Sequence, residues 1–166
     1  APPATSSAPV ASVASSPLSG AARRALVRSV DHSITTAVLV GAGDIGSCSS
    51  PGDEATARVV ARTPGTVFTA GDNAYPNGTL ADFRRCFDPS WGRFKDRTRP
   101  AVGNHEYQTK DASGYFGYFG ATAGRPGQGY YSYDLGAWHV VVLNSNCWVA
   151  GCTRGSAQER WLRADL

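Results

Sequence analysis

Three apolar runs, each followed by glycine and then by a carboxylate or an amide, constrain the fold of this chain most strongly. The runs with their ends are TTAVLVGAGD (35–44), Thr66–Ala70 with Gly71-Asp72, and Thr98–Val102 with Gly103-Asn104. Short apolar runs bounded by turn residues are typical of buried strands. We therefore expect three buried strands, each of which ends in a tight turn.

Helical patterns separate these strands. Residues 50–63 read SPGDEATARVVART, with Asp53 as the expected N-cap residue and apolar residues along one face. Thr79–Phe87 is a second, shorter amphipathic segment. Strand, helix, strand, helix, strand is the order that produces a parallel sheet covered by helices. The predicted fold class is α/β, with a layered sheet and flanking helices.

The character of the chain changes after Ser113, where the glycine- and aromatic-rich stretch GYFGYFG argues against a helix. The segments YYSYDL and GAWHVVVLNS then predict two antiparallel strands joined across Leu135–Ala137. Ser156 and Glu159 form an S-x-x-E pattern, which indicates the first turn of a helix over Ser156–Leu166.

The N-terminal segment differs in composition from the rest of the chain. Residues 1–20 contain only Ala, Pro, Ser, Thr, Val, Leu and Gly. Such a segment cannot bury enough apolar surface to offset its ordering entropy, so we expect 1–34 to be a disordered leader or linker and 35–166 to be the domain. The chain has no methionine, which suggests removal of a signal peptide, although a trimmed chain would have the same ends.

Four cysteines are present, and two of them enclose the short loop CWVAGC. In an exported protein this spacing indicates a disulfide between Cys147 and Cys152, which leaves Cys48 and Cys86 as a second pair. Free thiols and a zinc site are the alternatives. Zinc is disfavoured because the sequence has no C-x2-C pair and its histidines lie far from the cysteines. Disulfides would place the protein in a secreted or extracytoplasmic setting.

The charge and the apolar runs of the sequence bear on two kinds of partner, nucleic acid and membrane. The net charge is +3, from 16 basic and 13 acidic residues, and the only paired basic residues that stand out are Arg23-Arg24 and Arg84-Arg85. A balance this weak does not favour nucleic-acid binding. No run of about 18 apolar residues is present, so we expect no membrane span.

The three strand ends point to a binding site. In open α/β sheets, ligands bind beyond the carboxyl ends of the strands, so Asp44, Asp72 and Asn104 are expected to converge on one crevice. Two carboxylates and an amide oxygen are hard donors, which suit divalent or trivalent metals that prefer oxygen. His105 follows Asn104 directly. Each motif alone is an ordinary turn, but the three occur in order at successive strand ends.

The motifs GDIG, GDNAY and GNHE, in this order, resemble those of the calcineurin-like metallophosphoesterases. The GDxxY form is similar to the purple acid phosphatase branch in particular, and the resemblance covers residues 37–166. Most of the superfamily has a metal-binding histidine two residues after the first aspartate, where this chain has Gly46. In the purple acid phosphatases a tyrosine three residues after the second aspartate replaces that ligand, and Tyr75 stands at this position.

The resemblance implies a dinuclear centre and a phosphatase activity. Asp44 and Tyr75 would bind the first metal, Asp72 would bridge the two metals, and Asn104 would bind the second. His105 would contact the substrate and act as a general acid, whereas Glu106 receives no role. A phenolate ligand favours a trivalent first metal, which is iron in the family, and the second would be Zn, Mn or Fe. The implied reaction is metal-dependent hydrolysis of phosphate monoesters.

The histidines depart from the family pattern. The family completes its site with later histidines, two of them in a G-H-x-H motif, and this chain has only His32, His105 and His139. His32 precedes the first strand, and His139 is expected to be a core or sheet-face residue. We therefore expect the chain to be the N-terminal half of a longer enzyme. A phosphodiesterase or nucleotidase of the same superfamily and a catalytically incomplete exported binding module are the alternatives.

Overall fold

The computed structural model describes residues 36–166, and the predicted leader 1–34 lies outside this range together with His32. The described part is a mixed α/β domain with one small parallel sheet and one antiparallel hairpin. Its strands are β1 (Leu39–Ala42), β2 (Thr66–Ala70), β3 (Thr98–Ala101), β4 (Tyr131–Leu135) and β5 (Trp138–Val142). Its α-helices are α2 (Gly52–Ala61), α3 (Leu80–Asp82), α4 (Ser113–Phe119), α5 (Cys147–Ala150) and α6 (Ala157–Asp165).

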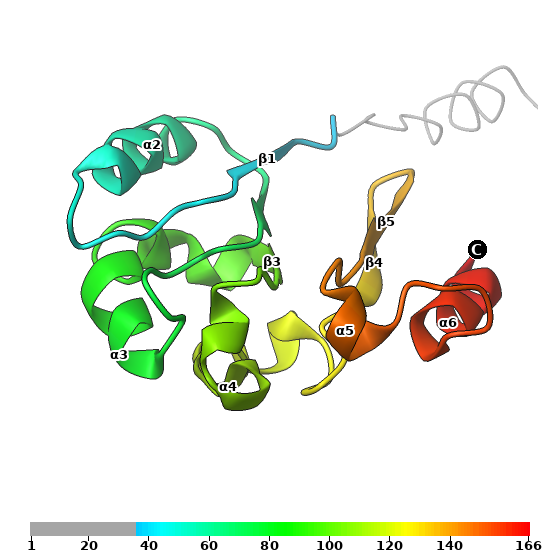
Figure 1. The fold of residues 1–166 in the computed structure, drawn as a ribbon. Coiled ribbons are helices and arrows are strands. Elements are labelled where there is room, and N and C mark those ends of the chain that lie inside the picture. The colour runs from blue at the N-terminus through cyan, green and yellow to red at the C-terminus, as the bar shows by residue number, and fades with distance from the viewer. Residues whose placement is uncertain (1–35) are drawn as a thin grey trace, which may run out of the picture. The chain divides into compact units, whose positions relative to one another are not determined.

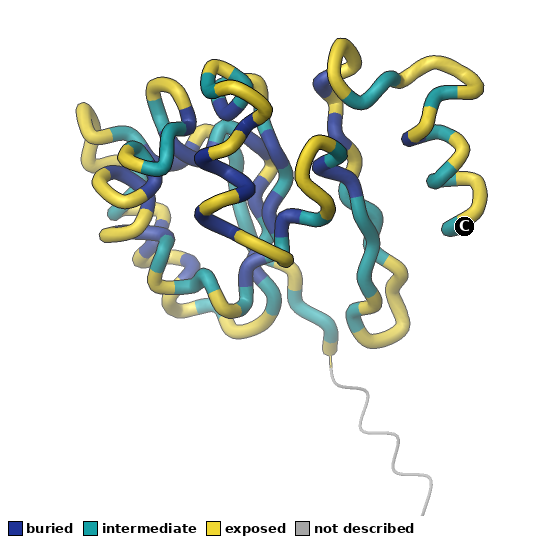
Figure 2. The backbone as a smooth tube through the Cα atoms, turned by 90° about the horizontal axis from the view of Figure 1, so that it is seen from below, coloured by how far each residue is buried: buried dark blue, intermediate teal, exposed yellow. Residues whose placement is uncertain are grey.

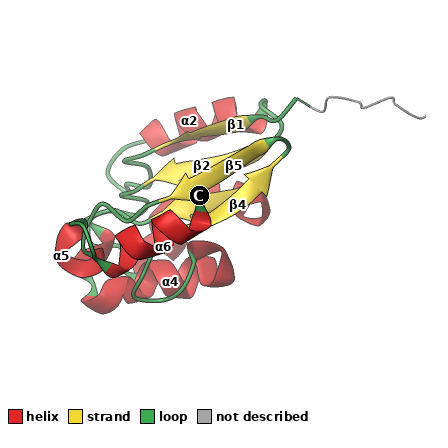
Figure 3. Cartoon of the chain, turned by 90° about the vertical axis from the view of Figure 1, so that its right-hand side faces the viewer, coloured by secondary structure: helices red, strands yellow, loops and turns green. Residues whose placement is uncertain are grey.

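The predicted parallel sheet is confirmed. Its order is β1-β2-β3, with Leu39 opposite Thr66 and Val67 opposite Thr98. β2 alternates in burial, since Val67 and Thr69 are buried whereas its other residues are more exposed. Figure 1 shows α2 and α3 on one side of this sheet and the β4–β5 hairpin on the other, and Figure 3 shows the hairpin from the side that carries α6. Two parallel strands must be joined by a crossover connection, and α2 provides this connection between β1 and β2.

The first helix begins differently from the prediction. α2 starts at Gly52, and Pro51 occupies the N-cap position without a side-chain hydrogen bond to the helix. Asp53 therefore lies inside the first turn, where its negative charge still interacts favourably with the helix dipole. The predicted N-cap role of Asp53 is wrong, because the proline before Gly52 already fixes the entry of the chain into the helix.

The second predicted helix consists of a short α-helix followed by a π-helical segment. Thr79 caps α3 in a reciprocal capping box with Asp82, and a π-helical segment follows over Phe83–Phe87. Phe83 and Phe87 are fully buried, so the apolar face expected from the sequence is present. A π-turn adds a residue to one turn of helix, which is a common feature near functional sites.

The segment that begins at Ser113 forms a helix, so the expectation that its composition argues against a helix is wrong. α4 buries four aromatic side chains, and Tyr118 stacks on Phe83 with ring centroids 4.8 Å apart. Burial of aromatic rings therefore outweighs the low helix propensity of glycine here. Gly114 is required by packing, because a Cβ there would lie 2.1 Å from the carbonyl oxygen of Gly78. Figure 2 shows the buried residues gathered around the parallel sheet and its helices, whereas α6 has a single buried residue, Gln158.

The antiparallel hairpin and the last helix are confirmed. β4 and β5 pair from Tyr131 opposite Val142 to Leu135 opposite Trp138. Ser156 caps α6 by accepting a hydrogen bond from the Glu159 amide at 3.3 Å. The Glu159 carboxylate accepts from the Gly155 amide instead of completing the reciprocal box.

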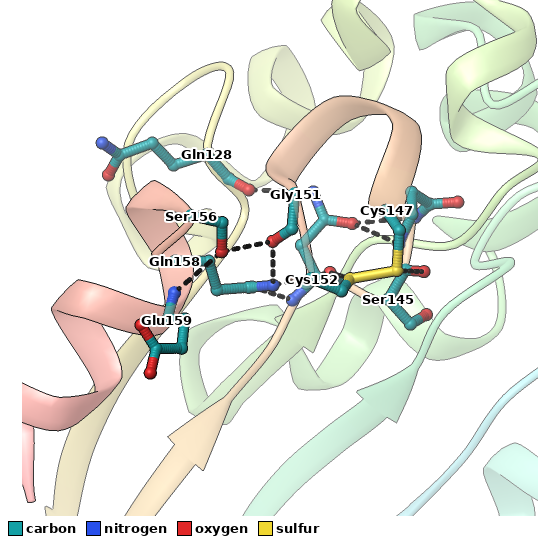
Figure 4. The surroundings of a disulfide bond; sticks show 10 residues. Gln128, Ser145, Cys147, Gly151, Cys152, Ser156, Gln158 and Glu159 are labelled. Atoms are coloured by element: carbon teal, nitrogen blue, oxygen red, sulfur yellow. Dashed lines mark hydrogen bonds between the residues drawn. A yellow bond between two sulfur atoms is a disulfide. The ribbon is translucent and has the colours of Figure 1, made fainter. Parts of the chain in front are cut away.

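Both predicted disulfides are present, and they account for all four cysteines. Cys48 and Cys86 have Cα atoms 4.8 Å apart, and Cys147 and Cys152 have Cα atoms 5.1 Å apart. The second bridge closes the loop that carries α5, and Figure 4 shows the hydrogen bonds around it, including the one from Ser156 to the Gly151 carbonyl. Two disulfides indicate an oxidising or extracellular location. Across residues 36–166, no helix combines the length and the apolar character needed to cross a bilayer.

His139 was predicted to be a core or a sheet-face residue. It is exposed on β5 of the hairpin, so it is a sheet-face residue and not a core residue. Its Nδ1 lies 2.8 Å from Asp134 on β4, and its Nε2 lies 2.9 Å from Asp165 on α6. The hydrogen bonds with Asp134 and then Asp165 raise the pKa of His139 above its ordinary value of 6.5. Protonated His139 thus links α6 to the hairpin.

We expect this link to weaken at alkaline pH. Because the folded pKa is raised, the stabilisation is complete below the unfolded pKa of 6.5 and is lost as the pH rises through the folded pKa. Melting temperatures measured between about pH 6 and pH 9 should fall more in the wild type than in His139→Gln, which has no charge to lose. Parallel pH profiles of the two proteins would contradict this assignment.

Candidate functional site

The loops after β1 and β2 run side by side beyond the end of the sheet. The Asp44 amide donates to the Gly71 carbonyl at 3.2 Å, and the Gly46 amide donates to the Asn73 carbonyl at 2.8 Å. The Tyr75 amide donates back to the Gly46 carbonyl at 2.8 Å. The parallel pairing thus continues past the strands, and it brings the GDIG and GDNAY motifs together at the carboxyl edge.

Three of the predicted metal ligands meet at this edge. The Tyr75 hydroxyl lies 2.5 Å from Oδ1 of Asp44, to which it donates a hydrogen bond. The same hydroxyl lies 3.5 Å from Oδ2 of Asp72. The phenol of Tyr75 is therefore placed between two carboxylates that come from different strands. Its position explains the spacing of the GDNAY motif.

The backbone at both aspartates is strained. Asp44 has φ of 52° and Asp72 has φ of 49°, which lie in the left-handed region that favours glycine. Non-glycine residues in this region are concentrated at functional sites, where the surrounding structure holds them in place.

Glycines make the close approach of these loops possible. A Cβ at Gly103 would lie 2.1 Å from both the amide nitrogen and Oδ1 of Asp72. A Cβ at Gly46 would lie 2.9 Å from the Asn73 carbonyl oxygen and 3.0 Å from Phe87. A histidine side chain cannot replace Gly46 without displacing this packing. The absence of a side chain at residue 46 therefore has a steric reason in this chain.

The third motif joins the site through the residue after Asn104. The His105 amide donates to Oδ1 of Asp72 at 2.9 Å, and the His105 ring lies 4.5 Å from that of Tyr75 between centroids. His105 Nδ1 lies 2.6 Å from the Pro76 carbonyl oxygen. A carbonyl oxygen only accepts hydrogen bonds, so Nδ1 carries a proton and orients the ring.

Asn104 is placed differently from the three clustered residues. It is exposed, and its side chain makes no hydrogen bond to any residue within 36–166. Its carbonyl accepts from the Tyr107 amide at 3.2 Å, which closes the turn that follows β3. Tyr75 is thus in contact with Asp44 and Asp72, and His105 adjoins them through Asp72, whereas the Asn104 side chain makes no hydrogen bond to this cluster.

Glu106 is the residue at this site that the sequence reasoning missed. Its side chain is fully buried and accepts four hydrogen bonds. The donors are the Asn73 amide at 2.8 Å, the Asn73 side chain at 3.2 Å, the Ala74 amide at 3.2 Å and the Gly103 amide at 2.7 Å. Burial raises the pKa of Glu106, and these hydrogen bonds oppose that rise. Glu106 therefore ties the GDNAY loop to the turn after β3.

Two acids beside a phenol set the electrostatics of the site. Partial burial, then the hydrogen bond to Asp44 and the charge of Asp72, raise the pKa of Tyr75 above the ordinary tyrosine value. A phenolate here would face two carboxylates, so without a cation the proton stays on the oxygen. A bound cation would favour loss of the Tyr75 proton, because its positive charge stabilises a phenolate beside the two carboxylates.

The oxygen-rich character of the cluster defines what it can bind. Within the described range 36–166, no three side chains drawn from His, Cys, Asp and Glu gather in a group able to hold a metal ion. The predicted ligand set differs in kind from such a group, because tyrosine and asparagine make up half of it. Two carboxylates and a phenol oxygen fit a hard cation and leave no role for a soft metal.

The chain was compared with family models, curated proteins and solved structures, and it matches none of them. The proposed function therefore rests on the motifs and on the geometry of the site.

Proposed function

We propose that this chain contributes metal ligands to an enzyme that hydrolyses phosphate monoesters, related to the purple acid phosphatase branch of the calcineurin-like metallophosphoesterases. The observation that supports this most is the placement of the Tyr75 hydroxyl between Asp44 and Asp72. Pro76-Asn77-Gly78 would form a turn without this tyrosine, so the turn alone does not require it.

The proposed ligands divide between two metal ions. Asp44 and Tyr75 would hold the first, with iron as the metal that best matches a phenolate. Asp72 touches both the Tyr75 side and the His105 side of the site, so it is the residue suited to bridging. Asn104 would hold the second metal, for which Zn, Mn or Fe are candidates. Metals at such a centre neutralise phosphate charge and lower the pKa of a bound water.

His105 would act on the leaving group. Its Nδ1 is occupied by the Pro76 carbonyl, which leaves Nε2 to contact a substrate. A protonated Nε2 can donate to the leaving oxygen as the ester bond breaks. The hydrogen bond to Pro76 fixes the ring in one orientation, which is a requirement for efficient proton transfer.

A binding module without catalysis is the second candidate, and one observation favours it. Among residues 36–166, the only histidine other than His105 is His139, which is paired with Asp134 and Asp165. The histidines that complete a dinuclear centre in the resembling family therefore have no counterpart in the described residues. In this alternative the chain binds a cation or phosphate but does not hydrolyse esters.

Hydrolysis assays on the complete protein separate these functions. We expect release of phosphate from an aryl monoester that is lost on chelation and restored by Fe, Zn or Mn, because the metals supply the water. Asp72→Asn should lower kcat about 100-fold or more, whereas Asp96→Asn, which replaces an exposed acid outside the three motifs, should not. Faster cleavage of a diester would favour the phosphodiesterase alternative. Chelator-resistant activity or no activity would reject the enzyme proposal.

A further inference from the structure

A hollow of about 350 Å³ is lined in part by Tyr75, and none of the other proposed metal ligands lines it. One wall is the loop after Asp44, which contributes Ser47 and Ser49, and the other is the π-helical turn that carries Arg85. The disulfide between Cys48 and Cys86 links these two walls. The hollow is therefore built on a covalently fixed frame rather than on two independent loops.

Arg85 is the cation of this hollow. It is exposed, and no acid within residues 36–166 pairs with it, whereas Arg93 and Arg163 are each paired with a glutamate. Asp82 also lines the hollow, but its carboxylate accepts from the Thr79 amide at 3.1 Å and from the Asn77 amide at 3.4 Å. Arg85 thus lines the hollow, and its guanidinium makes no hydrogen bond or ion pair with another residue within 36–166.

The serine loop supplies neutral donors opposite this cation. The hydroxyls of Ser47 and Ser49 lie 2.8 Å apart, and the Ser49 amide lies 3.4 Å from the Ser47 hydroxyl oxygen. Ser49 is exposed and Ser47 is half-buried, and both line the hollow. An arginine with nearby hydroxyl groups is the combination that recognises phosphate and carboxylate oxygens.

We propose that this hollow is an anion subsite beside the metal centre, formed by Arg85, Ser47 and Ser49, and that the substrate carries a second anionic group. The hollow lies at the lower end of the size range of small-molecule sites. Because Tyr75 and Pro76 also line it, a ligand at the metals can extend into it. The substrate class is then a phosphate ester with a second phosphate or a carboxylate, and this assignment depends on the proposed function.

Pyrophosphate binding tests the subsite without any metal or activity. Chelator-treated, ¹⁵N-labelled protein is titrated with inorganic pyrophosphate while the amides of Ser47 and Ser49 and the Arg85 Nε–H are followed by NMR. We expect these signals to shift together, and Arg85→Gln to weaken binding about tenfold through loss of a charge-assisted bidentate contact. Arg84→Gln is the matched control, because Arg84 is also exposed but does not line the hollow.

Each outcome decides the proposal. A tenfold loss in Arg85→Gln with less than about a twofold change in Arg84→Gln supports it. Equal losses in the two variants would show nonspecific attraction to a basic surface, and no shift at the serine loop would show that the hollow does not bind anions. Both results overturn the subsite. Neither depends on metal, so metal-dependent hydrolysis could still stand, and pyrophosphate binding could equally survive a failure of the enzyme proposal.

Discussion

Replacing Glu106 with glutamine should lower the free energy of unfolding by about 2 to 4 kcal/mol. The glutamine amide keeps one accepting oxygen, so it can serve either the Asn73 and Ala74 amides or the donors on the other side, but not both. Its NH₂ group would then face another N–H donor in a fully buried position. Denaturant unfolding followed by fluorescence measures the change.

Glu54→Gln is the control for this prediction. Glu54 pairs with Arg93 at 3.0 Å, but both side chains are exposed, so its loss should change stability by less than about 1 kcal/mol. Equal small effects of the two substitutions would show that Glu106 does not hold the two site loops together. The site would then need another explanation for its arrangement.

Tyr75→Phe should reduce the affinity of the complete protein for iron(III) by about 100-fold while leaving the fold intact. The phenylalanine ring keeps the packing of Tyr75 and loses only the donor oxygen, so stability should change by about 1 kcal/mol or less. Competition with a chelator of known affinity gives the loss of binding, and thermal unfolding of the metal-free variant gives the stability.

Tyr133→Phe is the matched control, because the Tyr133 hydroxyl is buried with no hydrogen-bond partner in the described part of the chain. It lies on β4 and should leave iron affinity unchanged. An unchanged iron affinity in Tyr75→Phe would remove Tyr75 from the ligand set and move the proposal toward the wider phosphoesterase superfamily.

The α/β class and the strand ends could be predicted because they depend on local patterns. β2 was predicted with its observed bounds, Thr66–Ala70, since it is a short apolar run between turn residues. The meeting of Asp44 with Asp72 followed from the rule that parallel strands end at one edge of a sheet. Both disulfide pairs were also predicted, although the distance between Cys48 and Cys86 depends on the fold.

The missed features depend on contacts between distant residues. Glu106 receives hydrogen bonds from Asn73, which lies 33 residues away in the sequence, and nothing in the GNHE motif itself specifies these partners. α4 forms because its aromatic rings fill the core around Phe83, a tertiary effect that outweighs its glycines. Propensity and capping patterns do not contain this information.

The visible absorption spectrum of the complete protein after addition of iron(III) tests the central claim most directly, which is that Asp44, Asp72 and Tyr75 form a metal centre. We expect a charge-transfer band, and a purple or pink colour, to grow until the site is filled, because a phenolate of Tyr75 would bind the ferric ion. Stoichiometric iron binding without such a band would show that Tyr75 is not a ligand. A folded protein that retains no iron would contradict the metal centre itself.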